Sequence, residues 1–189
     1  MEPVSYVFRV DSSGKIGSGH LMRCLTLARA LRDVGALCSF ICRALEGNLN
    51  RLVVAEGFSL NELAQSGAGA RTTYENEPYH SSWREVDWEV DAAETLNVLS
   101  ALKPQWLVVD HYGLWYDWQV AVGSGCKIMV IDDLADRNHH CDLLLDQNLG
   151  SDILRYESLI PSDCTTLFGP DYALLRPEFK EYREASLAR

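Results

Sequence analysis

Short apolar runs alternate along the chain with longer segments that carry apolar residues on one helical face. The runs are rich in Val, Ile and Leu and are continuous, as expected for strands buried on both faces of a sheet. The predicted strands cover residues 4–10, 37–42, 105–110, 126–132, 141–146 and 164–168. The predicted helices cover residues 19–34, 47–56, 91–102, 115–123, 151–159 and 177–187. This alternation predicts an α/β fold, a Rossmann-like parallel sheet with helices on both faces.

The first predicted helix has the clearest periodicity. Leu21, Leu25, Ala28 and Leu31 share one face, and Gly35 supplies a C-terminal stop. By contrast, residues 63–90 are polar, rich in Trp and without a clear period. Because long structureless loops in compact domains are usually functional or disordered, we expect a mobile excursion beside the site or an irregular edge there.

Composition and charge narrow the class of protein. The chain has 189 residues, of which 47% are hydrophobic and 23% charged, which is typical of one ordinary globular domain. Its formal net charge of -10 argues against a nucleic-acid partner, since phosphate backbones are bound by a surplus of Lys and Arg. An anionic ligand would therefore have to be held by local groups.

The length of the apolar runs, the N-terminal residues and the cysteines bear on the cell compartment. No run approaches the ~20 apolar residues that span a bilayer, and the start "MEPVSY" does not resemble a signal peptide, so we expect no membrane partner and a cytoplasmic location. The six cysteines form no C-x-x-C pair, and we expect reduced thiols rather than disulfides or metal ligands. They are Cys24, Cys38, Cys42, Cys126, Cys141 and Cys164.

Polar residues follow four of the predicted strands, in "RVDSSGKIGSGH", "VVDHYG", "VIDDLADR" and "LLLDQN". Ligands of open parallel sheets bind outside the carboxyl ends of the strands. Any one of these groups could simply cap a turn, because Asp and Asn favour turns on backbone grounds. Together they predict a polar rim at one edge of the sheet.

The glycine-rich loop "GKIGSGH" fits neither common nucleotide motif. A Walker A loop needs Lys and a hydroxyl after the last glycine, where this chain has His20 and Leu21. A dinucleotide fingerprint needs a third glycine at the position of Met22. The remaining interpretation is a turn whose backbone amides, at a helix N-terminus, face an anion or a developing negative charge.

His20 lies at the mouth of this loop, where an imidazole is expected to be mostly neutral at pH 7, uncovered and able to accept a proton. A general base and a turn cap are both compatible with this position. Arg23, one turn later, is slightly unfavourable at the positive end of a helix, which favours a functional contact as much as a solvated side chain. His139 and His140 have no second ligand cluster, so we expect no metal.

Four segments together resemble the UDP-sugar hydrolases of pseudaminic acid biosynthesis. They are "FRVDSSGKIGSGHLMRCLTLARAL", "VVDHYGL", "VIDDLADRNHHCDLLLDQN" and "FGPDYALLRPEF". Members of this family release UDP from UDP-2,4-diacetamido-2,4,6-trideoxy-β-L-altropyranose. The likeness covers the whole chain, and this order of motifs is specific, whereas a lone G-x-G-H would be weak.

The resemblance implies a GT-B-like architecture of two Rossmann-like domains, related to the N-acetylglucosaminyltransferase of peptidoglycan synthesis. It implies metal-independent and cofactor-free cleavage at the anomeric carbon with inversion, in which His20 activates water and Tyr112 contributes to the site. The remaining expected substrate-binding residues are Asp11, Gly17, Ser18, Gly19, Arg23, His111 and Asp133. Asp11 would orient the loop or a sugar hydroxyl, and for Asp110 and His111 sugar binding and a structural bond are both open. Of Asp132 and Asp133, we expect one structural residue and one near the cleft.

The chain differs from this family in extent. Family members continue after "LLRPEF" into a second domain that holds most of the UDP, whereas this sequence stops shortly afterwards. Residues 1–176 are therefore expected to be the N-terminal domain and 177–189 the start of an interdomain helix, with the C-terminal nucleotide-binding domain absent. Such a half should bind UDP weakly and turn over little substrate. A glycosyltransferase of the same architecture, or a non-catalytic sugar-binding fragment, are the alternative functions.

Overall fold

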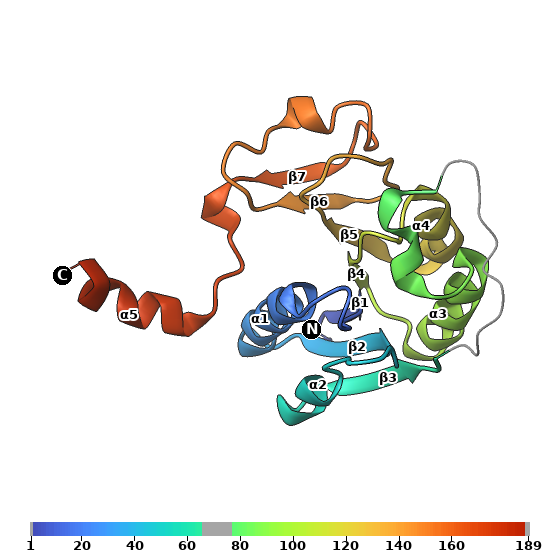
Figure 1. Cartoon of the computed structure of the whole chain (residues 1–189), viewed down its shortest axis with the longest axis horizontal. Helices are drawn as coiled ribbons and strands as arrows, with labels where there is room; N and C mark the ends of the chain where they lie inside the picture. The colour runs from blue at the N-terminus through green and yellow to red at the C-terminus, as the bar shows by residue number, and fades with distance from the viewer. Residues whose placement is uncertain (1, 66–76, 188–189) are drawn as a thin grey trace.

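A computed structural model describes residues 2–65 and 77–187 of the chain (Figure 1). Seven parallel strands form one sheet in the order β3-β2-β1-β4-β5-β6-β7. The strands are β1 (Ser5–Val10), β2 (Leu37–Arg43), β3 (Ser59–Leu63), β4 (Trp106–Asp110), β5 (Lys127–Ile131), β6 (Leu143–Asp146) and β7 (Thr165–Phe168). The predicted α/β, Rossmann-like class is therefore confirmed.

Four helices lie on the two faces of the sheet (Figure 1). They are α1 (Gly19–Asp33), α2 (Arg51–Ala55), α3 (Trp88–Leu102) and α4 (Tyr116–Val122), and α5 (Pro177–Leu187) follows at the end of the described chain. Short 3-10 helices are η1 (Tyr79–Arg84), η2 (Gly123–Gly125), η3 (Ile153–Arg155) and η4 (Pro170–Tyr172). Helix α5 leads away from the sheet at the end of the chain (Figure 1).

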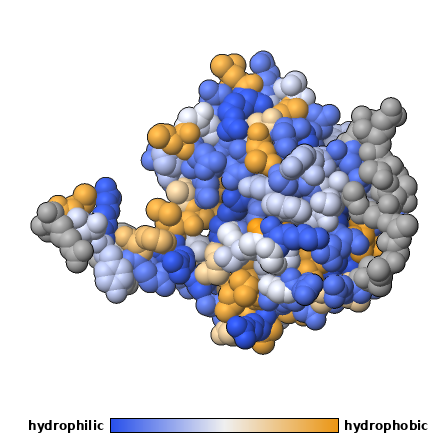
Figure 2. Space-filling view, viewed as in Figure 1, coloured by the Kyte–Doolittle hydropathy of each residue, from blue (hydrophilic) through white to orange (hydrophobic). Residues whose placement is uncertain are grey.

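Two apolar cores lie on opposite faces of the sheet, because successive side chains of a strand point to opposite sides. On β1, Val7 packs in the core beneath α3 and α4, whereas Phe8 packs beneath α1. The Phe8 ring stacks on Phe40 of β2 with 4.8 Å between ring centroids. In the view of Figure 2, hydrophilic side chains cover most of the surface and apolar ones form small separate groups.

The topological switch point of the sheet lies between β1 and β4. The chain runs from β1 outward to β3 and then returns to place β4 on the other side of β1. Ligands of open α/β sheets bind at such a switch point, outside the carboxyl ends of the strands. The loop after β1 and the residues after β4 meet there.

Several element boundaries differ from the sequence prediction. The edge strand β3 was not predicted, because "SLNEL" is short and half polar. Residues 151–159 were predicted as a helix, but only η3 forms, since the Tyr156 ring turns into the core, where its single O–H is shared between the carboxylates of Asp132 and Asp146.

Two further predictions concern segments around turns. The helix predicted from residue 47 begins at Arg51, because Gly47 has a φ of +73° and its backbone lies against Gly14. The excursion predicted for 63–90 contains η1 and the start of α3, and its residues 66–76 lie outside the described part of the chain. All six cysteines are free in the structure, and three of them, Cys24, Cys42 and Cys141, are buried.

A fully buried ionic cluster joins three elements beneath the switch point. Asp91 of α3 accepts hydrogen bonds from Arg9 of β1 at 2.6 Å and Arg43 of β2 at 2.7 Å, and from the Trp118 indole of α4 at 3.0 Å. Asp91, Arg9 and Arg43 are all 0% exposed. Burial opposes the charge on Asp91, but the two arginines outweigh it and keep the pKa of the carboxyl well below its usual range.

We predict that Asp91→Asn lowers the free energy of unfolding by about 3–5 kcal/mol, because it leaves two buried guanidinium groups without their shared counter-charge. Urea unfolding followed by circular dichroism measures the change. Asp163→Asn, the same change at an exposed position, is the control and should stay within about 0.5 kcal/mol. Equal effects of the two substitutions would contradict this account.

Candidate active site

The loop between β1 and α1 is built by its own side chains and glycines. The Ser13 hydroxyl accepts the amide hydrogens of Lys15 at 3.2 Å and Ile16 at 3.1 Å. Gly17 closes the turn onto the Ser13 carbonyl with a φ of +79°, a conformation that favours glycine. Gly17, Ser18 and Gly19 are exposed, and the first amides of a helix such as α1 have no partner within the helix.

His20 and Asp110 form a hydrogen-bonded pair at the switch point. His20 Nδ1 lies 2.6 Å from Asp110 Oδ1, although the residues are 90 positions apart in the chain. Because an ionised carboxylate only accepts hydrogen bonds, Nδ1 carries a hydrogen in this contact, and the neutral form of the ring has its lone pair at Nε2. Nε2 has no partner among the described residues and is not fully buried. The ring is thus oriented as a proton acceptor.

Arg23 completes this arrangement. Its guanidinium contacts both oxygens of Asp110, at 2.5 Å and 2.7 Å, and reaches Asp133 at 3.2 Å. Burial opposes the charge on Asp110, but His20 and Arg23 outweigh it and lower the pKa of the carboxyl to about 2. The unfavourable position of Arg23 in the first helical turn is explained by these two carboxylates.

Tyr112 lies over His20 at the mouth of the site. Its hydroxyl donates to Asp133, and its ring meets the His20 ring edge-on with 4.5 Å between centroids. Burial and the contact with Asp133 raise the pKa of Tyr112 above its ordinary value, so the phenol stays protonated. Asp133 is thereby the residue of the Asp132–Asp133 pair that faces the site, whereas Asp132 is 0% exposed and pairs with Arg137 at 2.6 Å.

Asp11 and His111 lie below this layer. Asp11 is 0% exposed and accepts from Arg9 at 2.6 Å and from the Arg43 amide at 2.7 Å. His111 is 2% exposed, accepts the Gly113 amide hydrogen at Nδ1, and its Nε2 lies 3.4 Å from Asp11. These contacts are all with protein groups and brace the ends of β1 and β4. Direct contact of either residue with a ligand stays a prediction.

His20 was expected to be uncovered, but it is 7% exposed. Besides Tyr112, the Trp83 ring of η1 covers it, with 5.9 Å between centroids. Sequence reasoning did not place Trp83 in the site, because residues 63–90 show no period. For Asp110, sugar binding and a structural bond both stayed open. Nothing in "VVDHYG" shows that the partner of this carboxylate is His20, 90 residues earlier in the chain.

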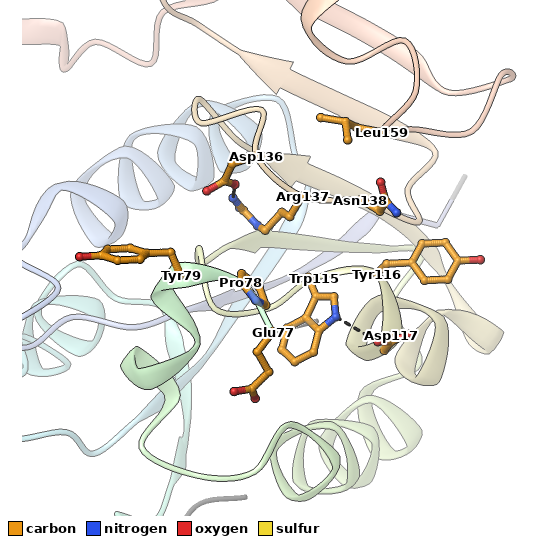
Figure 3. A pocket seen from close by; sticks show the side chains of 10 residues that line it. All are labelled: Glu77, Pro78, Tyr79, Trp115, Tyr116, Asp117, Asp136, Arg137, Asn138 and Leu159. Carbon is orange, nitrogen blue, oxygen red and sulfur yellow. Dashed lines mark hydrogen bonds and ion pairs between the residues drawn. The ribbon is translucent and has the colours of Figure 1, made fainter. Parts of the chain in front are cut away.

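A cavity of about 700 Å³ adjoins the site. Figure 3 shows its lining, with Asp136 and Arg137 on one side and Glu77 and Trp115 on the other. Arg137 connects it to the site, because its guanidinium also stacks on the Tyr112 ring at 5.3 Å. The polar rim predicted from the strand ends thus has a hollow beside it.

Residues 2–65 and 77–187 contain no group of three or more His, Cys, Asp or Glu side chains that could hold a metal ion. None of the described helices is long and apolar enough to cross a bilayer. The absence of a metal in the reaction stays a prediction.

Solved structures define the class of fold. MurG of Acinetobacter baumannii matches 79% of this chain and 43% of its own, with a TM-score of 0.54 and 11% identity. A glycosyltransferase from Rickettsia africae matches the whole chain and 50% of its own, with a TM-score of 0.51 and 11% identity. At these identities the likeness concerns the fold, which is that of one domain of a GT-B glycosyltransferase. No family model matches the chain.

The expected sequence resemblance is confirmed. The chain is 34% identical over 181 residues to the UDP-2,4-diacetamido-2,4,6-trideoxy-beta-L-altropyranose hydrolase of Campylobacter jejuni. The match covers 95% of this chain and 54% of that protein, so the chain spans about half the length of this relative.

We predict that stability falls as the pH is lowered because of His111. Burial lowers its pKa to about 3, against about 6.5 in an unfolded chain, so between these values the unfolded state binds the extra proton. This contribution is present above pH 6.5 and is lost as the pH falls toward 3. It amounts to about 2 kcal/mol between pH 7 and pH 5.

Urea unfolding at a series of pH values measures this loss, with His111→Asn as the comparison. The Asn oxygen can accept the Gly113 amide hydrogen, but the side chain does not titrate. The variant should therefore lose less stability than the parent over this range. Parallel pH profiles would show that His111 is not the responsible group.

Proposed function

We propose that this chain is the base-bearing domain of a UDP-sugar hydrolase, which releases UDP from UDP-2,4-diacetamido-2,4,6-trideoxy-β-L-altropyranose in pseudaminic acid biosynthesis. The relative that carries this activity in its name supports the substrate class. The observation that carries the proposal is the His20–Asp110 pair with Nε2 left open at the switch point.

In the proposed reaction, water attacks the anomeric carbon on the face opposite UDP. His20 Nε2 takes a proton from the water while the new C–O bond forms. The bond between the anomeric carbon and the UDP oxygen breaks with inversion, and UDP leaves with the electron pair. Because a diphosphate is a good leaving group, the step needs a base and positioning rather than a strong acid or a metal, and the base is commonly worth ~10²–10⁴ in rate.

The neighbouring groups have complementary roles in this proposal. Asp110 holds the imidazole in the tautomer that accepts at Nε2 and stabilises the imidazolium that forms. The amides of Ser18 and Gly19, at the start of α1, stabilise charge on the phosphate oxygens, as helix N-termini do for anions, and Gly17 shapes the turn that presents them. Tyr112 and Asp133, already tied to Arg23 and to each other, line the entry to His20 and bind the sugar.

We further propose that a second domain completes the cleft. The chain spans 54% of the hydrolase that it resembles, and its last helix leads away from the sheet (Figure 1). Residues 1–176 then form one wall of the cleft, and 177–189 begin the connection. The nucleotide would be held mostly by the other wall, whereas the chain described here aims the base.

A glycosyltransferase is the second candidate, favoured by the fold of MurG and of the Rickettsia enzyme. His20 would then deprotonate an acceptor hydroxyl instead of water. Incubating the complete gene product with the UDP-sugar in the absence of acceptor separates the two functions. The hydrolase releases UDP and free sugar in equal amounts, whereas the transferase releases little of either.

The isolated 189 residues should hydrolyse the UDP-sugar far more slowly than the complete gene product. A normal rate of hydrolysis by the isolated chain would contradict the two-domain proposal.

We predict that His20→Asn in the complete gene product lowers kcat by at least about 10²-fold, because water loses its proton acceptor. The dissociation constant of UDP, measured by calorimetry, should change less than about twofold, since the nucleotide is held elsewhere. His140→Asn, at an exposed histidine outside the site, is the matched control. Retained turnover in His20→Asn would remove this residue from the role of base.

A further inference from the structure

Trp83 of η1 lies against four aromatic rings at the site, although it belongs to a segment without regular periodicity. The centroid of its ring lies 4.4 Å from that of His80, 5.5 Å from that of Tyr112 and 5.9 Å from that of His20. The His111 ring is nearly perpendicular to it, with 6.4 Å between centroids. The indole therefore belongs to the group of aromatic rings that surrounds His20.

The segment that carries Trp83 is fixed to the end of β4. A Cβ atom at Gly113 would lie 2.9 Å from the His80 carbonyl oxygen, so only glycine allows the η1 backbone this close. At the other end of η1, Arg84 is 0% exposed, pairs with Glu77 at 2.5 Å and stacks on Trp115 at 4.8 Å. Trp83 is thus held against the site by contacts on both sides.

The polar end of the Trp83 side chain is unused. Its indole N–H donates to none of the described residues and is not fully buried. Trp115 and Trp118, in contrast, donate to Asp117 and Asp91, each at 3.0 Å. Because an indole N–H in a packed site usually has a partner, this open donor beside His20 is available to a ligand.

We propose that Trp83 is a specificity-determining residue that contacts the sugar of the substrate, an inference that rests on the proposed function. The sugar named in the related hydrolase has two acetamido groups and no hydroxyl at carbons 2, 4 and 6. Such a sugar presents methyl groups and amide carbonyls where others present hydroxyls. The indole ring packs against the apolar groups, and its N–H donates to an acetamido oxygen.

The test measures binding of the two product halves separately, by titration calorimetry on the complete gene product. The probes are free 2,4-diacetamido-2,4,6-trideoxy-altropyranose and UDP. Trp83→Phe keeps most of the ring but removes the N–H, and should raise the dissociation constant of the sugar about tenfold. Trp83→Ala removes both and should raise it about a hundredfold. The constant for UDP should change less than about twofold in either variant.

Trp106→Phe is the matched control. Trp106 is also half-buried, but it begins β4 and so lies at the opposite edge of the sheet from the site, where its substitution should leave both constants unchanged. Thermal unfolding checks that the variants are folded. The proposal is overturned if the parent protein does not bind the sugar, if the Trp83 variants bind it as the parent does, or if both constants rise together.

The two proposals can fail independently. If Trp83 variants lose affinity for the sugar while His20→Asn hydrolyses normally, the sugar contact stands and the assigned base is wrong. If His20→Asn is inactive while the Trp83 variants bind the sugar normally, the base stands and Trp83 serves only to cover the ring.

Discussion

The carboxylate of Asp110 is the group on which the arrangement of the site depends. It is 0% exposed, and its two oxygens accept from His20 and Arg23 of one helix. A buried charge is tolerated only when it is paired and hydrogen-bonded, so these contacts also attach the start of α1 to the end of β4. The same bonds orient the imidazole, so one carboxylate both joins the two elements and holds the ring in place.

Below this layer, a second set of buried charges stiffens the support. Asp11 joins Arg9 to the Arg43 amide, and Asp91 joins both arginines from α3. The strands that end at the switch point are thus cross-linked just beneath the residues that face the solvent. Such a rigid support holds the His20 ring at a defined angle.

The sequence predicts most of the sheet and the place of the site, because buried parallel strands have continuous apolar runs and carry polar residues at their ends. It predicts His20, Tyr112 and Asp133 through the loop and the family resemblance, although their ligand contacts stay predictions. It does not predict the helix boundary at Arg51 or the absence of a helix at 151–159, since Gly47 and Tyr156 are placed by tertiary contacts. Nor does it reveal the η1 rings over the site, because no periodicity links residues 79–84 to the end of β4.

The 90-residue separation between the imidazole and its carboxylate has a consequence for folding. Helix α1 is a local element, but its histidine has no partner until β4, which follows β2, β3 and α3 along the chain, lies beside β1. A nascent or partly folded chain therefore contains the loop and the His20 ring without the carboxylate that orients it. The two residues are brought together only when β4 pairs with β1.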